Sequence, residues 1–191
     1  MKTDKSAKER LFGTAGRLFY ENGYRATGVD TIAAESGIGK MTLYRHYPSK
    51  DDLIVSYLRD SDAAFWANFE QITGKEADPR KKLLAFFGEL QHYVLSPACY
   101  GCPFLNLATE YPEADYGGHL VAIEHKRTVR ARLKKLAKEA GARRPHALAN
   151  ALVLLMDGAY MASRMFGGAH DSPAAHLTEA AERLVDAYCE I

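Results

Sequence analysis

The segment from residue 40 to residue 46 is rich in side chains that can contact nucleic acid: Lys40, Met41, Thr42, Tyr44, Arg45 and His46. Lysine can donate to guanine edges or to phosphate, threonine can reach a base or a thymine methyl, and tyrosine and histidine can bond phosphate oxygens. Only Ile38, Leu43 and Tyr47 are suited to a core, so packing does not require this polar surface. The pattern predicts a recognition helix, and a helical hairpin that binds nothing is the alternative.

A second group that could carry chemistry is Cys99-Tyr100-Gly101-Cys102. Cys102 precedes a helix expected over 103–110, and a helix N-terminus can lower the pKa of a thiol and raise its reactivity. Three interpretations stay open: a buried apolar cysteine, a thiol that senses oxidants or electrophiles and pairs with Cys99, and a metal ligand together with His92 or His125. One C-x-x-C without a second ligand pair does not make a convincing zinc site, so no metal is predicted.

The chain shows no motif of a familiar enzyme class. It has no Ser/His/Asp grouping, no glycine-rich phosphate loop and no H-E-x-x-H, and the βαβ context of a thioredoxin-like C-x-x-C is missing. We therefore predict no catalytic residue, no cofactor and no enzymatic activity. An all-α oxidoreductase or peroxidase-like enzyme and a helical adaptor that binds ligand but not DNA are the alternatives.

The composition is that of a globular protein, with 191 residues, 47% hydrophobic and 26% charged residues and a net charge of +1. No apolar run approaches the roughly 18 residues that span a bilayer, and the odd number of cysteines, three, fits a reducing compartment. A cytoplasmic protein without membrane contact is expected. Residues 1–50 hold nine Lys/Arg against five Asp/Glu, or +4, which leaves −3 for 51–191. The two parts are expected to meet different partners.

Helical periodicity recurs along the whole chain, which predicts an all-α fold. Three capping boxes, Ser6-x-x-Glu9, Thr27-x-x-Asp30 and Ser49-x-x-Asp52, mark helix starts, while Gly23 and Gly37 mark helix ends. They enclose two short helices, the second over about Gly39 to Tyr47, joined by a glycine-containing turn as in a helix-turn-helix. Further helices are predicted at about 50–72, 79–95, 103–110, 117–140, 145–167 and 173–189.

The segments Thr31–Ile38 and Thr42–Leu53 resemble the DNA-binding signature of TetR-type (TetR/AcrR) transcriptional repressors, and the resemblance covers about residues 6–55. It implies an N-terminal three-helix helix-turn-helix domain over 1–50 and a helical ligand-binding and dimerisation domain over 51–191, with about nine helices in all. It also implies repression that is relieved when a small molecule binds, although the same DNA-binding domain can serve an activator.

Carried over by position, the resemblance assigns base-edge contacts to Lys40, Met41 and Thr42. Phosphate contacts fall to Tyr44, His46 and Lys50, and also to Thr27, which we expect at a helix N-terminus where an anion is favoured. Gly39 and Met41 depart from the residues that are frequent in the family. Gly39 weakens the helix cap, because glycine supplies no side-chain acceptor, and Met41 leaves the base preference open.

A homodimer is expected, because one short helix reads only a few base pairs whereas a two-fold dimer reads a palindromic operator. The helices at about 145–167 and 173–189 would form its four-helix interface. Aromatic residues in the middle of the chain predict either a plain core or a pocket for a small, largely apolar or electrophilic effector. The predicted ligand-binding residues are Trp66, Phe69, Phe86, Leu90, Cys102, Phe104, Asn106, Tyr160 and Arg164.

Overall fold

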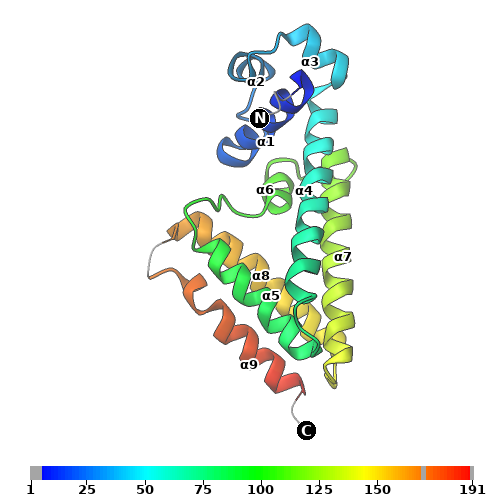
Figure 1. Cartoon of the computed structure of the whole chain (residues 1–191), viewed down its shortest axis with the longest axis vertical. Coiled ribbons are helices and arrows are strands. Elements are labelled where there is room, and N and C mark those ends of the chain that lie inside the picture. Colours follow the sequence, from blue (N-terminus) through cyan, green and yellow to red (C-terminus); the bar gives the residue numbers. More distant parts are fainter. Residues whose placement is uncertain (1–5, 169–170, 190–191) are drawn as a thin grey trace. The chain divides into compact units, whose positions relative to one another are not determined.

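The computed structural model describes residues 6–168 and 171–189, and this part of the chain is helical with no β-strand (Figure 1). The elements in order are α1 (Ala7–Asn22), α2 (Val29–Ser36), α3 (Lys40–His46), α4 (Lys50–Thr73), α5 (Pro79–Val94), α6 (Pro103–Glu110), α7 (Gly117–Glu139), α8 (Pro145–Phe166), the 3-10 helix η1 (Pro173–His176) and α9 (Leu177–Cys189). The all-α prediction is confirmed, and the predicted ends of the longer helices agree to within one residue except at the start of α9. There, residues 173–176 form η1 instead of α-helix.

Local capping explains most of the helix boundaries. The Ser6 box is present in both directions, with Glu9 N donating to Ser6 Oγ at 3.2 Å and Ser6 N donating to Glu9 Oε2 at 2.7 Å. Ser49 caps α4 by accepting from Asp52 N at 3.0 Å. The α2–α3 turn uses Gly37, whose φ of +68° is a left-handed conformation that side-chain-bearing residues rarely adopt.

The capping box predicted at Thr27 is wrong. The N-cap of α2 is Gly28, and no side chain caps this helix. The Thr27 side chain instead points into the core, where its hydroxyl donates to the carbonyl oxygen of Gly23 at 2.7 Å and also lies 3.1 Å from that of Leu18. Thr27 therefore links the turn between α1 and α2 to the end of α1. The capping pattern does not reveal this contact.

The chain forms two compact units, and the division falls within helices α4 and α7. Unit 1 consists of residues 1–62 and 103–123, and unit 2 of residues 63–102 and 124–191. Unit 1 thus contains the segment 1–50 expected as the DNA-binding domain, together with the start of α4, all of α6 and the start of α7. The described structure begins at residue 6, so Lys2, Asp4 and Lys5, which entered the charge count, lie outside the described residues.

Unit 1 has its core where α1, the short helices and α4 meet. Leu11, Leu18 and Phe19 of α1 are buried, as are Ile38, Leu43 and Tyr47, the three core residues expected in or next to α3. Gly16 lets α1 approach α4 closely, because a Cβ there would lie only 3.1 Å from the ring of Tyr57.

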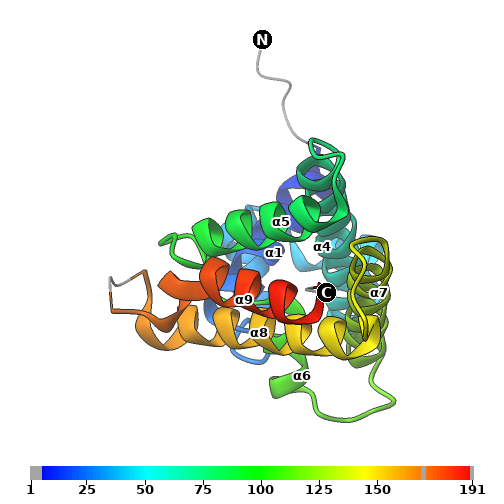
Figure 2. The same cartoon turned by 90° about the horizontal axis from the view of Figure 1, so that it is seen from below.

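Unit 2 is built around α5, α8 and α9, which run side by side in Figures 1 and 2. Their buried faces are formed by Leu83, Phe86, Phe87, Leu90 and Val94 of α5, Leu148, Leu152 and Met156 of α8, and Leu177, Ala181 and Val185 of α9. Polar contacts also join α9 to α5: Arg80 pairs with Asp186, and the side-chain oxygen of Gln91 accepts from Thr178 N at 2.8 Å.

Candidate nucleic-acid interface and ligand site

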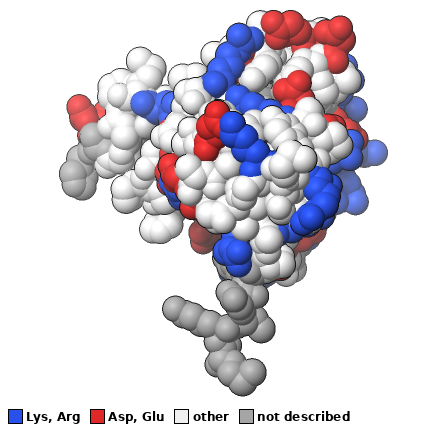
Figure 3. All heavy atoms as spheres, turned by 90° about the horizontal axis from the view of Figure 1, so that it is seen from above, with Lys and Arg blue, Asp and Glu red and all other residues white. Residues whose placement is uncertain are grey.

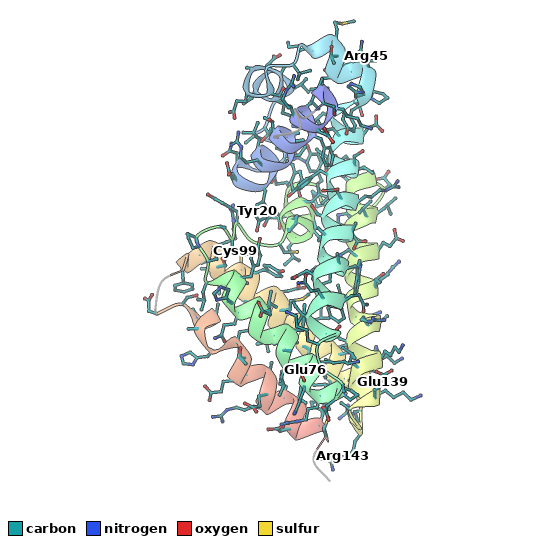
Figure 4. All side chains as sticks on the ribbon, viewed as in Figure 1. Tyr20, Arg45, Glu76, Cys99, Glu139 and Arg143 are labelled. Carbon is teal, nitrogen blue, oxygen red and sulfur yellow. The ribbon has the colours of Figure 1, made fainter. Side chains whose placement is uncertain are left out.

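Helix α3 presents most of its non-core side chains to solvent. Met41 is 84% exposed, Tyr44 is 44% exposed, and Lys40 and Arg45 are also exposed, whereas Thr42 and His46 are half-buried. Arg45 projects from the end of the helix in Figure 4. The buried Leu43 holds the opposite face in the core, so the exposed side chains share a defined orientation.

Three of the predicted contacts are restricted by their surroundings within unit 1. Lys40 forms an ion pair with Asp30 of α2, so a bound phosphate or base has to compete with that carboxylate. Lys50 is half-buried at the start of α4, and burial lowers the pKa of its ammonium group although Asp51 and Glu110 oppose the shift. Thr27 is only 2% exposed and its hydroxyl is used internally, so it is not available for the phosphate contact expected of it.

Arg45 belongs among the candidate contacts, although the family resemblance assigned it no role. It is exposed on the same short helix as Tyr44 and is always charged, which suits it to phosphate or guanine. The signal was present in the sequence, since Arg45 lies within the polar segment 40–46.

Acidic residues partly neutralise the basic side chains of residues 1–50. Arg17 pairs with both Glu21 and Glu35, and Arg25 lies 3.8 Å from a Glu113 carboxylate oxygen. Figure 3 accordingly shows basic and acidic side chains intermingled on the face seen from above. Counted by compact unit, unit 1 holds 10 Lys/Arg against 12 Asp/Glu, while unit 2 holds 15 against 12. The +4 of residues 1–50 is thus a property of that segment alone and is not carried by the whole of unit 1.

Helix α6 is joined to the α1–α2 turn within unit 1. The Glu110 carboxylate accepts from the backbone N–H of Tyr24 at 3.0 Å and of Arg25 at 2.6 Å, and the Tyr24 hydroxyl donates to the carbonyl oxygen of Pro103 at 2.9 Å. The Arg25 guanidinium lies over the Tyr111 ring, 4.6 Å from its centroid. These contacts were not foreseen, because residues about 80 positions apart share no local pattern.

The segment after α6 adds a second connection inside unit 1. The Tyr116 hydroxyl donates to Asp51 of α4 at 2.9 Å, and the rings of Tyr111 and Tyr116 stack with centroids 4.4 Å apart. Burial and this hydrogen bond raise the pKa of the Tyr116 phenol. The α1–α2 turn and the N-terminal turn of α4 therefore both hold the segment 103–116.

Unit 2 contains an aromatic cluster made of Phe65, Trp66, Phe69, Phe86 and His125. Phe65 is at its centre, with ring centroids 4.8 Å from His125, 5.1 Å from Trp66 and 6.1 Å from Phe86. Three predicted ligand residues, Trp66, Phe69 and Phe86, thus belong to one cluster, and Leu90 is buried on α5. Phe65 and the buried His125 complete the cluster but were not among the predicted ligand residues.

The other predicted ligand residues lie elsewhere. Phe104 and Asn106 belong to unit 1, and Arg164 is exposed on α8. Tyr160 is buried, and its ring centroid lies 6.4 Å from that of Tyr93; burial, followed by the neighbouring Cys102, raises the pKa of its phenol well above the ordinary value.

Cys99 and Cys102 are both buried, and neither forms a disulfide within the described residues. Cys102 is 4% exposed, and the carbonyl oxygen of Cys99 accepts from the Ser163 hydroxyl at 3.3 Å. Within residues 6–168 and 171–189, no three His, Cys, Asp or Glu side chains gather as metal ligands would. His125 lies among aromatic rings, as expected of an imidazole in a core.

An apolar groove of about 330 Å³ runs along α8 where η1 and α9 meet it. Leu154, Leu155, Ala162, Leu177 and Ala180 are among its lining residues. Leu154 and Met165 of α8 are each 73% exposed, and Met161 is 47% exposed. These residues lie 7 and 4 positions apart, a spacing that puts them on one face of the helix.

A helix-turn-helix followed by a larger helical unit is the architecture of a class of bacterial transcription regulators that consist of a single type of chain. The comparisons with known proteins agree with this class. Residues 11–57 match the family described as "Bacterial regulatory proteins, tetR family". The crystal structure of SCO4454, a TetR-family transcriptional regulator from Streptomyces coelicolor, is 31% identical and superposes with a TM-score of 0.86 over 96% of this chain and 94% of that one. The chain belongs to the TetR family of transcriptional regulators and is not an enzyme.

Two curated relatives match part of the chain. The repressor KstR2 of Mycolicibacterium smegmatis is 32% identical over 82 residues, which is 43% of this chain and 40% of KstR2. The activator FasR of the same organism is 31% identical over 87 residues, 44% of this chain and 40% of FasR. The chain thus matches about two fifths of the length of these relatives. No helix in the described part of the chain is long and apolar enough to cross a membrane.

Proposed function

We propose that the protein is a homodimeric repressor that binds a palindromic operator through α3 and is released by a small, largely apolar effector. The observation that carries the proposal is the exposed polar face of α3, set on a buried Leu43 anchor. Met41 at 84% exposure is positioned for a base, because a thymine methyl offers an apolar partner in the major groove. Tyr44 and Arg45, one turn further on, are positioned for phosphate.

The proposed dimer forms through α8 and α9. Leu154, Met161 and Met165 put apolar side chains on the solvent side of α8, and the groove beside them offers a place for a partner's side chains. Pairing α8 and α9 with their copies would bury this surface in a four-helix bundle. Two heads held by one two-fold axis can then read two half-sites of a palindrome.

The proposed effector site is the aromatic cluster of unit 2. Apolar rings with one buried polar group, His125, have the general character of a small-molecule site. Phe65, Trp66 and Phe69 belong to α4, which continues from unit 1 without a break, so displacing them acts on a helix that begins beside α3. The effector must bind the operator-incompetent arrangement better, by about 1.4 kcal/mol for each tenfold loss of operator affinity.

Selection of bound fragments from sheared DNA of the source organism tests the proposal. We expect a palindrome to be enriched at moderate salt, and we expect transcription from a promoter that carries it to fall when the protein is added. Arg45→Ala should then lower the affinity for the selected duplex at least about fivefold, in line with about 1 kcal/mol or more for a lost contact of this kind. Lys81→Ala removes the same charge from an exposed position on α5 and should leave that affinity unchanged.

Three results would contradict parts of this proposal. Enrichment of no palindrome would overturn operator binding. Equal losses from Arg45→Ala and Lys81→Ala would remove α3 from the interface. Increased transcription from the selected promoter would show that the protein is an activator that uses the same DNA-binding domain.

A further inference from the structure

The second half of α7 and the turn after it are the most basic part of the chain. Residues 126–144 contain nine Lys/Arg and one acidic residue, Glu139. This segment belongs to unit 2, whereas α3 belongs to unit 1. The inference below therefore concerns a different surface from the proposed operator contact and does not depend on it.

Basic residues on the sides of α7 that face other helices are already paired. Lys126 forms an ion pair with Asp157 of α8, and Arg132 forms one with Glu70 of α4. Figure 2 shows α7 at the edge of the helices of unit 2, with α4 and the end of α8 beside it. The charges turned toward the rest of unit 2 are thus balanced inside the protein.

The outer face of α7 carries a different set, which we call the basic stripe: Arg127, Arg130, Lys134 and Lys138. All four are exposed, and no ion pair involves any of them within residues 6–168 and 171–189. Their spacing of 3, 4 and 4 residues keeps them on one side of the helix. Arg143 and Arg144, also exposed, extend the positive charge beyond the end of α7. Glu139 and Arg143 are labelled in Figure 4 and mark this end of the helix and the turn after it.

The neighbours of the stripe decide which partner it suits. The exposed residues beside it are Glu124, Thr128, Ala131, Lys135 and Glu139, of which Lys135 and Glu139 pair with each other, and none of the five is aromatic or a large apolar residue. A helix that lies in a membrane surface needs Trp, Phe or Leu on its apolar face, and a protein interface usually needs an aromatic or apolar anchor. A row of cations without such an anchor suits a phosphodiester backbone, where binding is driven by the release of counterions.

The length of the basic stripe also matches the phosphate spacing of duplex DNA. From Arg127 to Lys138 the helix rises about 16 Å, at about 1.5 Å per residue. One strand of duplex DNA carries a phosphate for about every 3.4 Å of helix axis, so the stripe runs along about five phosphates. The stripe has no Asn or Gln that could read a base.

We infer that the basic stripe of α7 is a second DNA-binding surface, which binds the phosphate backbone of duplex DNA without regard to sequence. It gives the protein a contact with flanking or separate duplex in addition to the one made by α3. Binding through this surface falls steeply with salt, because each phosphate contact contributes about 0.9 to the slope of log affinity against log salt concentration.

The test uses the full-length protein and a duplex of about 30 base pairs without a palindrome. Affinity is followed by fluorescence anisotropy across a series of potassium chloride concentrations for Arg130→Gln with Lys134→Gln. The matched control is Lys75→Gln with Lys81→Gln, which removes the same charge from exposed positions of unit 2 outside α7. The stripe variant should lower the salt slope by about 2, and the control should leave it unchanged.

A 2 × 2 design separates this inference from the proposed function. The stripe variant is combined with Arg45→Ala, and each is also measured alone. Loss from the stripe variant on the palindrome-free duplex, together with no effect of Arg45→Ala on the selected operator duplex, would keep the second surface and overturn the proposed role of α3. Equal slopes for the stripe variant and its matched control would overturn the second surface. Stripe-dependent binding of poly-glutamate or of phosphatidylglycerol vesicles, with duplex binding unchanged, would also overturn it and assign the stripe to an acidic protein or to a membrane.

Discussion

The Glu110 carboxylate at the end of α6 accepts the backbone N–H of Tyr24 at 3.0 Å, and thereby holds the α1–α2 turn to a helix 86 residues away in the chain. The same carboxylate accepts from Arg25 N at 2.6 Å. Gly23 makes this approach possible, since its φ is +95° and a Cβ there would lie 2.9 Å from Glu110 Oε1. One side chain thus satisfies two backbone donors in the turn that precedes α2.

Removing this carboxylate should destabilise the protein. Hydrogen bonds to a charged group contribute about 1.5–3 kcal/mol, so Glu110→Ala should lower the free energy of unfolding by about 2 kcal/mol in urea denaturation. Glu113→Ala is the control, because the Glu113 side chain is exposed and forms a 3.8 Å ion pair with Arg25. Exposed pairs of this kind contribute about 0–1 kcal/mol, so the control should change little. Equal effects of the two variants would show that Glu110 does not hold the turn.

Alkaline pH should weaken the fold through Tyr116. Its phenol has a raised pKa in the folded protein, first because it is buried and second because it donates to Asp51. A raised pKa means that the stabilisation is complete below the ordinary phenol pKa of 10.0 and is lost as the pH rises above it, because the unfolded phenol ionises first. Between pH 9 and pH 11, the free energy of unfolding should therefore fall less for Tyr116→Phe than for the wild type. The same pH dependence in both proteins would contradict the assignment.

The comparison between sequence and structure separates local contacts from long-range contacts. Ser6 and Ser49 act over three residues, so their capping roles were visible in the sequence and are confirmed. Thr27 has the same local pattern, but its hydroxyl donates to the carbonyl oxygen of Gly23 at the end of α1, and only the fold reveals this competing acceptor. The role of Glu110 could not be predicted either, since it depends on how the segment 103–116 returns to α1. Among the predicted ligand residues, helical spacing relates Trp66 to Phe69 on α4, but it could not show that Phe86 of α5 joins them or that Phe104 and Asn106 belong to unit 1.

Met41 should influence which base is preferred and should leave stability unchanged. Its side chain is 84% exposed, so Met41→Ala removes no core packing, and the free energy of unfolding should stay within about 0.5 kcal/mol of the wild-type value. If Met41 contacts a base, the preference at one position of each half-site should weaken, by about 1–3 kcal/mol of discrimination at most. Sequencing of fragments selected by each protein measures the change. Identical preferences would exclude Met41 from base contact.

Leu154 should be essential for self-association. It is 73% exposed on α8 and lines the apolar groove shared with η1 and α9, so Leu154→Glu places a carboxylate in the proposed interface of each subunit. An unpaired buried charge costs about 3–5 kcal/mol, so the dissociation constant measured by sedimentation should rise at least about a hundredfold. Leu120→Glu is the matched control, since Leu120 is a 54% exposed leucine at the start of α7, in unit 1. A dimer that survives Leu154→Glu, or that is lost equally in both variants, would rule out the α8–α9 surface as the interface.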